Sequence, residues 1–468
     1  MDNNSTIPKP RRWVKRAAIT VGVLILLAVA LLITAKRYLK PELHDLQFSG
    51  SEIPGMHNCL WIGPVTYSQF NVAYPDEGAI YWPTVFKMPA GATLEITSDF
   101  PRLRYFSFHS YDSASRPYDS VYDEQLQPES GGNPFTTAGA EGRYKITVKQ
   151  EKRPDGQKPD PNVLYLGDAG AAARIPMILR HYVPETGSDL TGGAGLPEVI
   201  LITADGRRLK GQQMCEAIGS PQIGSANRTI STPTIPELLY KVMLMLPGNE
   251  KGHPARSTPE WLKFWGSKVA VQRIGPRNTI DKSIAKSRAG ELPIASGFYA
   301  NRQADYITSY INQEFGDVLV LKGKLPKTPA TGWDWARGDY DMRYWSMCTN
   351  ESLVTTRFAS CVYDSNVIVD DQRNYTIVVS TKANRPSNAT RECGITWLDW
   401  GEFGDGVGNA NLGLLIMRNI LPHRNFHQAI QNMPAMDGAE EFMGPYQPKS
   451  KYTGRKAFES TGCKETSP

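Results

Sequence analysis

The residues best suited to acid–base chemistry lie close together in the segment 106–112, FSFHSYD. His109 is followed three positions later by Asp112 and has the hydroxyl groups of Ser107 and Ser110 beside it. A serine, a histidine and an aspartate perform hydrolysis when the fold aligns them in one hydrogen-bonded row. The chain has no G-x-S-x-G motif, which would hold a nucleophilic serine on a sharp turn. Hydrolysis or lyase chemistry at His109 and Asp112 is therefore an alternative and not the favoured interpretation.

Four arginines in strand-like segments are the candidates for binding an anion: Arg104, Arg180, Arg343 and Arg418. A guanidinium group grips carboxylates and phosphates with two parallel hydrogen bonds. The same group is costly to bury unless an acidic residue pairs with it. We therefore predict structural ion pairs first, with Arg104 and Arg343 buried against a carboxylate or a carbonyl. A basic pocket for an anionic ligand is the second interpretation.

Two loops contain other candidate ligand-binding residues. The loop LDWGEFGDGVGN contains Asp399, Glu402 and Asp405, whose oxygens suit Ca²⁺. Their spacing lacks the EF-hand pattern, so an ordinary turn is favoured, and no metal or other cofactor is predicted. The loop TGWDWARGD contains Trp333 and Trp335, which we expect to be exposed and able to stack on a sugar or another flat ligand.

The strings around the arginines occur twice in the chain and in the same order. RYFSFHS at residues 104–110 matches RYWSMCT at 343–349, and ILRHYVP at 178–184 matches IMRNILP at 416–422. Three further matches keep the same order: LEITSDFP with LVLKGKLP, SVYD with CVYD, and YKITV with YTIVV. The sequence therefore predicts a duplicated domain.

Each copy is predicted to be an antiparallel β-sandwich of jelly-roll type, over residues 58–210 and 296–434. The matched strings alternate apolar and polar residues, and Gly, Pro, Asn and Asp gather between them. That pattern favours short antiparallel strands over a parallel sheet with long helices.

The remaining exported segments are predicted to be a partly helical connector and an irregular strap. The connector, residues 211–295, contains the helix-like stretch Pro236–Met245 and a second stretch that includes Trp261 and follows Pro259. Residues 435–468 are rich in Gly, Pro and Lys and are expected to lie as an irregular C-terminal strap.

Residues 17–35 form an uncharged run that is long enough to cross a membrane as a helix. Basic residues are more numerous before this run than after it, so the positive-inside rule places residues 1–16 in the cytoplasm. A cleaved signal peptide is the alternative, although Lys36 directly follows the run. We expect an uncleaved single-pass anchor in the cytoplasmic membrane, with the bulk of the chain in the periplasm or at the cell surface.

All six cysteines lie beyond the expected anchor, and an even number outside the cytoplasm indicates disulfides. The matched strings place Cys348 and Cys361 on two strands that we expect to be antiparallel neighbours, so their Cα atoms would lie within bonding distance. Cys59 with Cys215 is the second predicted pair, because these residues bracket the first copy. Cys393 and Cys463 are then paired by elimination.

The strings PRLRYFSFHSYD, ETGSDLTGGAGLP, MRYWSMCTNE and GITWLDWG resemble those of a family of uncharacterised exported bacterial proteins. The resemblance covers most of residues 58–463. It implies an envelope location and a β-rich fold, and it supplies no activity and no catalytic residues.

Three function classes remain for a chain of 468 residues with a net charge of +5. The basic residues are spread along the chain, so nucleic-acid binding is not indicated. A non-enzymatic envelope protein that binds a partner protein, a glycan or a lipid is favoured, because no catalytic signature is present. An envelope- or carbohydrate-directed hydrolase or lyase is one alternative. An accessory subunit of a membrane complex is the other.

Overall fold

The computed structural model describes the chain in segments, namely residues 42–46, 60–113, 115–154, 160–168, 170, 173–219, 228–232, 235–245, 254–264, 298–434 and 437–463. The described chain is mainly β, with four sheets of four to six strands, one two-stranded ribbon and a few short helices. All but two of the strand pairs are antiparallel. The predicted antiparallel β class is therefore confirmed.

Within those residues no helix is long and apolar enough to cross a membrane. The predicted tail at residues 1–16 and the predicted anchor at 17–35 lie outside the described residues.

The first half of the molecule, residues 60–219, is built from two sheets. One sheet has the order β2-β9-β4-β5, with strands β2 (Ala79–Phe86), β9 (Ile175–Pro184), β4 (Leu103–Tyr111) and β5 (Pro117–Tyr122). The other has the order β11-β10-β3-β7-β6 with β8 beside β7, formed by β11 (Arg208–Leu209), β10 (Glu198–Ile202), β3 (Thr93–Asp99), β7 (Gly142–Lys149), β6 (Pro128–Gly131) and β8 (Val163–Tyr165). A buried apolar cluster with residues from both sheets includes Phe106, Phe108 and Ile146.

The second half, residues 298–463 together with strand β13 (Leu262–Phe264) of the connector, is also built from two sheets. One has the order β13-β14-β20-β16-β17, with β14 (Ala304–Asn312), β20 (Leu412–Pro422), β16 (Met342–Asn350) and β17 (Phe358–Tyr363). The other has the order β19-β18-β15-β21, with β19 (Thr396–Asp399), β18 (Asn374–Ser380), β15 (Val318–Lys324) and β21 (Lys449–Thr453). Its own apolar cluster includes Trp345, Met347 and Ile377.

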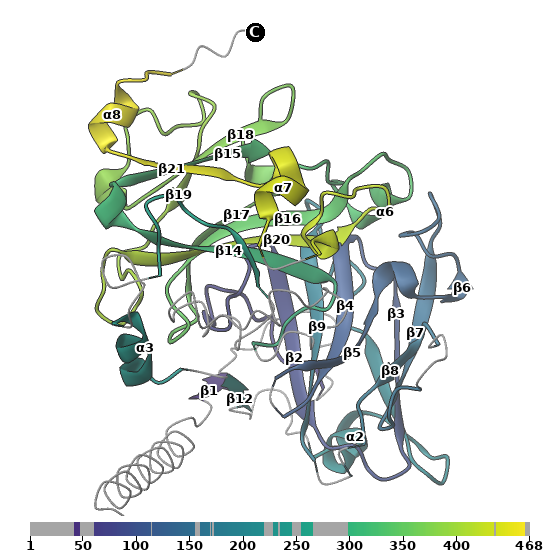
Figure 1. Ribbon diagram of the computed structural model, residues 1–468. Coiled ribbons are helices and arrows are strands. Elements are labelled where there is room, and N and C mark those ends of the chain that lie inside the picture. The colour runs from purple at the N-terminus through teal and green to yellow at the C-terminus, as the bar shows by residue number, and fades with distance from the viewer. Residues whose placement is uncertain are drawn as a thin grey trace, which may run out of the picture.

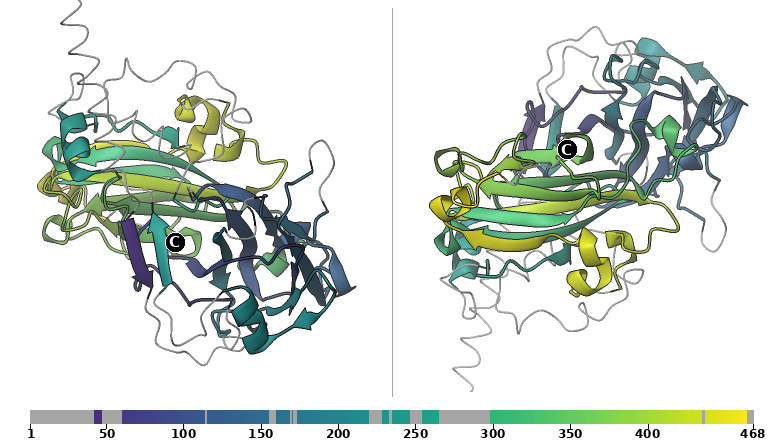
Figure 2. Two further views of the ribbon diagram at one scale, coloured as in Figure 1. Left: turned by 90° about the horizontal axis from the view of Figure 1, so that it is seen from below. Right: turned by 90° about the horizontal axis from the view of Figure 1, so that it is seen from above.

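The strings that match in the sequence occupy corresponding places in the two strand orders. RYFSFHS lies in β4 between β9 and β5, and RYWSMCT lies in β16 between β20 and β17. Each of these two strands is followed by a neighbouring strand that ends in a short 3-10 turn, η1 (Asp123–Gln125) or η4 (Asp364–Asn366). Figures 1 and 2 show the first half, purple to teal, lying against the second half, green to yellow.

Both β4 and β16 are buried along their whole length. One face of each strand packs into its own sandwich, and the other meets the opposite half through a cluster that includes Tyr105, Tyr182 and Tyr344. Polar side chains on these inner strands are therefore held at an interface and not on the molecular surface.

The connector agrees with its prediction in one element and differs in another. Helix α3 (Glu237–Leu244) lies within the predicted helical stretch, and α2 (Gly211–Ala217) precedes it. The stretch after Pro259 is not a helix, because residues 262–264 pair with β14 as strand β13 and extend the sheet. The connector also contributes β12 (Arg228–Thr232), which pairs with β1 (Glu42–Leu46).

The C-terminal segment is more regular than the predicted strap. It contains α7 (Ala439–Met443), strand β21 and α8 (Arg455–Glu459). Strand β21 pairs with β15 and so forms one edge of the outer sheet. Backbone pairing with an existing sheet edge accounts for the order, which composition alone does not indicate.

Candidate functional site

The predicted burial of Arg104 and Arg343 is confirmed, and each arginine pairs with an aspartate of the opposite half. Arg104 of β4 bonds to Asp364, while Nη1 of Arg343 lies 3.1 Å from Oδ2 of Asp123. Each aspartate also accepts a 2.9 Å backbone hydrogen bond from the inner strand of its own half, from Phe106 or Trp345. The two ion pairs are therefore reciprocal links between the halves, and these arginines are engaged by the fold.

The interface affects the ionisation of its acidic groups. Burial raises the pKa of Asp123 to about 6, even though the positive charge of Arg343 acts in the opposite direction. A carboxylate removed from water favours its neutral form unless a cation compensates it. The ion pair with Arg343 and the backbone hydrogen bonds from Phe106 and Glu124 thus favour the charged form of Asp123.

His109 and Asp112 are not brought together as a catalytic pair. His109 is fully buried, and its Nε2 accepts a 3.0 Å hydrogen bond from the backbone N–H of Arg302. Burial and the charges of Arg180 and Arg302 hold the pKa of His109 well below its usual range. Asp112 lies beyond the end of β4, where Nε of Arg116 is 2.6 Å from its carboxylate.

The tryptophans predicted to be exposed are packed instead. Trp333 and Trp335 lie in the single-turn helix α6 (Gly332–Trp335), and both are half-buried. Nε1 of Trp333 donates to the carbonyl of Pro101 in the first half, with the guanidinium of Arg102 4.1 Å from its ring centre. The ring of Trp335 lies 4.9 Å from the guanidinium of Arg343. Trp333 therefore packs across the interface between the halves, and Trp335 packs against the buried Arg343 of its own half.

The acidic loop after β19 forms turns and does not gather its carboxylates around one point. Asp405 is buried and accepts hydrogen bonds from the backbone N–H groups of Val407 and Asn409. Asp399 and Glu402 lie 3.6 and 3.4 Å from the ammonium group of Lys382. Within the described residues the one group of close metal-ligating side chains consists of Asp76 and the bonded cysteines 348 and 361.

Two of the three predicted disulfides are present. Cys348 and Cys361 are directly paired in the register of β16 and β17, and they are bonded with a Cα–Cα distance of 4.0 Å. Cys393 and Cys463 are bonded with a Cα–Cα distance of 4.7 Å. The third predicted pair joins Cys215 to Cys59, which lies outside the described residues.

A small cavity lies between the halves and is lined by two of the candidate arginines. Arg180 of β9 and Arg418 of β20 both reach it, together with Asn301 and several tyrosines. The cavity has a volume of about 90 Å³. Aromatic rings lie beside both guanidinium groups, with Tyr81 5.8 Å from Arg180 and Tyr306 5.7 Å from Arg418.

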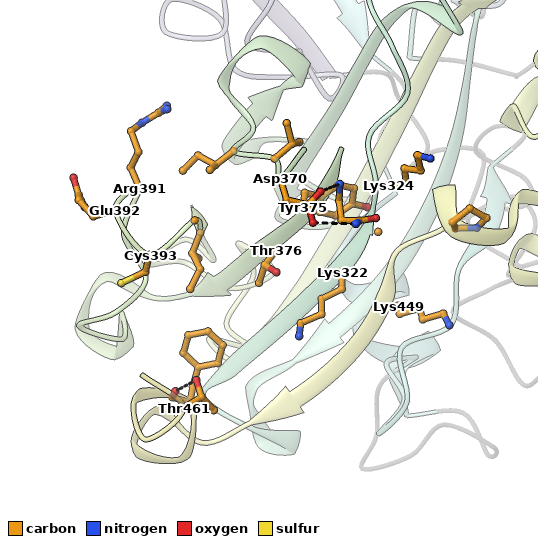
Figure 3. Close-up of a pocket in the computed structure, with 18 of the residues that line it drawn as sticks. Lys322, Lys324, Asp370, Tyr375, Thr376, Arg391, Glu392, Cys393, Lys449 and Thr461 are labelled. Atoms are coloured by element: carbon orange, nitrogen blue, oxygen red, sulfur yellow. Dashed lines mark hydrogen bonds between the residues drawn. The ribbon is translucent and has the colours of Figure 1, made fainter. Parts of the chain in front are cut away.

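A much larger groove of about 950 Å³ lies on the outer face of the sheet that contains β15. Lys322, Lys324 and Lys449 line it, and the loop around Arg391 and the C-terminal helix α8 flank it (Figure 3). Lys322 and Lys449 are direct partners in the register of β15 and β21. We call this feature the lysine groove.

None of these three lysines makes an ion pair with a carboxylate in the described part of the chain. Three acidic residues also line the lysine groove, namely Asp370, Glu392 and Glu440. Asp370 is held by hydrogen bonds from Asn374, and these lower the pKa of its carboxyl. The charge of Lys324 also lowers the pKa of Asp370, whereas Lys322 and Lys449 have no acidic partner in the described part of the chain.

The corresponding face of the first half is neutralised. At the places of Lys322 and Lys324, strand β3 has Thr97 and Asp99. Asp99 lies 2.9 Å from Arg143, and Lys145 lies 2.8 Å from a carboxylate of β6. Two unpaired lysines directly opposite each other, Lys322 and Lys449, are thus not repeated at these places of the first half.

Sequence inspection missed the lysine groove. Its signal was the alternation in VLVLKGK and KSKYT, which places lysines on one face of each strand. The sequence does not indicate that these two strands are neighbours, because more than a hundred residues separate them in the chain. The sheet order shows that they are.

Comparison with known proteins places the chain in no family, since no family model and no curated protein matches it. Among solved structures it is similar to an uncharacterized protein from Burkholderia cenocepacia, with 11% identity and a TM-score of 0.42 over 88% of this chain and 84% of that one. It is also similar to the VPA0106 protein from Vibrio parahaemolyticus, with 11% identity and a TM-score of 0.36 over 81% of this chain and 90% of that one.

Proposed function

We propose that the chain is a non-enzymatic binding module of the cell envelope and that the lysine groove holds an acidic glycan. The observation that carries this proposal is the pair Lys322 and Lys449, which lie directly opposite each other without an acidic partner among the described residues. Like charges in this arrangement destabilise a sheet. An anionic ligand would neutralise the two lysine charges, so we infer that they serve to bind one.

Edge protection accounts for only part of the lysine pattern. Lysines on an edge strand prevent unwanted pairing with other chains, and Lys449 lies on the edge strand β21. Lys322 and Lys324 lie on β15, which is flanked by β18 and β21. Their charge has no such protective role, so a bound anion is the better explanation.

The wall of the lysine groove suits a chain of acidic sugars. Besides the ammonium groups it presents the hydroxyl-bearing residues Thr376 and Thr461 and the apolar side chains of Ile395 and Phe458. An acidic glycan has anionic groups, hydroxyl groups and apolar ring faces, which match these three features. A flat bilayer surface is less suited to a groove.

The proposed location is extracytoplasmic, with residues 17–35 as the membrane anchor. The disulfides Cys348–Cys361 and Cys393–Cys463 support this location, because such bonds persist in oxidising compartments. We further propose that the halves arose by duplication of one β-sandwich domain. The equal strand orders around β4 and β16 support this origin.

Calorimetric titration of the full-length chain with oligogalacturonate tests the proposed function. Each sugar of this probe has a carboxylate, so we expect binding at about 0.1 M salt that weakens strongly at about 1 M. Neutral dextran oligomers should not bind. Binding of anionic phosphatidylglycerol vesicles without binding of oligogalacturonate would instead indicate a membrane partner and would overturn the glycan proposal.

The double variant Lys322→Thr, Lys324→Asp introduces the residues of the first half into the lysine groove. We expect it to lose oligogalacturonate binding. Lys145→Thr is the matched control, because it removes a lysine from the corresponding face of the first half and should leave the affinity unchanged. Equal binding by the double variant and the unmodified chain would show that the lysine groove is not the site.

A further inference from the structure

Arg180 and Arg418 occupy corresponding positions in the two halves. Each lies in register with a tyrosine on one neighbouring strand and a serine on the other, Tyr81 and Ser107 for Arg180 and Tyr306 and Ser346 for Arg418. In both cases Nη2 donates to a tyrosine carbonyl of the opposite half, Tyr299 or Tyr74. The two guanidinium groups are therefore held in the same way.

The charge of Arg418 is neutralised by Asp76. Nη1 of Arg418 lies 3.2 Å from Oδ2 of Asp76, and Ser346 donates to the same oxygen at 2.6 Å. The hydroxyl group of Tyr344 donates to Oδ1 of the same carboxylate. Every group around this buried cation thus has an acceptor.

Asn301 stands at the corresponding place in the other site. Its carbonyl accepts from Ala304 at 3.1 Å, as that of Asp76 accepts from Ala79, and its Oδ1 accepts from Tyr105 at 3.1 Å. The amide nitrogen Nδ2 therefore replaces the second carboxylate oxygen. Where Asp76 presents a charged hydrogen-bond acceptor to Arg418, Asn301 therefore presents an uncharged donor to Arg180.

Three buried donors consequently have no hydrogen-bond acceptor in the described part of the chain. They are Nη1 of Arg180, Nδ2 of Asn301 and Oγ of Ser107. Arg180 is only 2% exposed. A buried guanidinium group stays charged at all relevant pH values, so its charge must be compensated by an anion.

We propose that the cavity between the halves is a binding site for a small monovalent anion, chloride or a short carboxylate such as formate, held by Arg180 and Asn301. Both residues line the cavity, and its volume is about 90 Å³. A cavity needs about 10–15 Å³ of such volume to hold one water molecule, so this one admits an ion of a few atoms. This site is separate from the lysine groove.

Thermal unfolding of the full-length chain at constant ionic strength tests the site. The reference buffer contains a gluconate salt, because gluconate is too large for the cavity. In the test series chloride or formate replaces the gluconate. We expect the melting temperature to rise by about 1–2 °C at an anion concentration tenfold above the dissociation constant. Separate chloride and formate series show which anion is preferred. An identical melting temperature in all three salts would mean that water fills the cavity and would overturn the proposal.

Two variants assign the effect to Arg180. Asn301→Asp supplies the missing carboxylate, so the variant should be more stable than the unmodified chain in gluconate and should not respond to chloride or formate. Arg180→Met removes the charge and should also abolish the response, which provides a second route if Asn301→Asp does not fold. A response retained by both variants would contradict the assignment.

The double variant Lys322→Thr, Lys324→Asp is the control for the lysine groove. It should keep the full response to chloride or formate, because it leaves the cavity between the halves intact. Loss of the response in this variant would place the anion in the lysine groove instead. The two proposals therefore fail or succeed independently.

Discussion

The two halves place an arginine at the same point of their interface and neutralise it differently. In the second half Arg418 is paired with Asp76 at 3.2 Å. In the first half Arg180 faces Asn301, and its Nη1 has no acceptor in the described chain. The difference between the carboxylate of Asp76 and the amide of Asn301 thus distinguishes a structural ion pair from a proposed anion-binding site.

The outer faces show the opposite difference. The first half pairs its surface charges, as between Asp99 and Arg143 at 2.9 Å. The second half has Lys322 and Lys449 directly opposite each other without an ion pair among the described residues. The comparison teaches that the strand pattern determines where a charge lies, whereas its compensation depends on one neighbouring residue.

The largest expected effect comes from breaking the reciprocal ion pairs. Asp364→Asn leaves Arg104 buried without its carboxylate, whereas Asp123→Asn leaves Arg343 with Glu124 alone, 3.2 Å from its Nη2. Removing one member of a buried pair costs about 3–5 kcal/mol. We expect a loss of this size for Asp364→Asn and a smaller one for Asp123→Asn in denaturant unfolding at pH 7. A loss below about 1 kcal/mol in either would show that the link is not reciprocal.

The disulfide of the second half gives the next effect. Cys348 and Cys361 are 13 residues apart, and the corresponding residues of the first half are His109 and Ser120. Loop closure over this distance stabilises by about 3 kcal/mol. The double variant Cys348→Ser, Cys361→Ser should lose that amount and still fold, since the first half has no such bond. An unfolded variant in circular dichroism would contradict this expectation.

Acid should destabilise the first half through His181. Burial lowers the pKa of His181 to about 4 from the usual 6.5. The unfolded chain therefore binds this proton at higher pH than the folded chain, so stability is lost as the pH falls from about 6.5 to about 4. The loss attributable to His181 approaches about 3 kcal/mol.

His181→Asn provides the comparison with the second half, which has Asn419 at the corresponding place. We expect the variant to show a smaller loss of unfolding free energy between pH 6.5 and pH 4, measured by urea titration at each pH. An unchanged pH dependence would mean that His181 is already protonated in the folded chain.

The smallest effect concerns the lysine groove without its ligand. Lys322→Thr relieves the repulsion from Lys449 and should stabilise the chain by about 0.2–1 kcal/mol at low salt. The gain should vanish in about 1 M salt, where charges are screened within a few ångströms. A gain that is independent of salt would point to packing and not to charge.

The features predictable from the sequence are those set by local pattern. Alternating residues in the matched strings gave the β class, and the repeated position of Cys348 and Cys361 gave their pairing. The packed state of Trp333 was not predictable, because its partner Pro101 lies more than two hundred residues away. The strand at residues 262–264 was missed for a similar reason, since pairing with β14 overrides the local helical pattern.

The candidate sites were less accessible to sequence analysis than the fold. Arg180 was identified as a binding candidate, but its lack of a carboxylate partner depends on Asn301, which approaches from the other half. Lys322 and Lys449 face each other only because β21 returns to the edge of the sheet. Both features arise from contacts between distant segments, and no spacing rule describes them.

The most direct test of the difference between the halves is a crystal structure of the full-length chain grown in bromide. An anomalous difference map identifies this anion by its scattering. The account predicts a bromide ion beside Nη1 of Arg180 and Nδ2 of Asn301, and none beside Nη1 of Arg418. A map with no bromide at Arg180, or with equal peaks at both arginines, would contradict it.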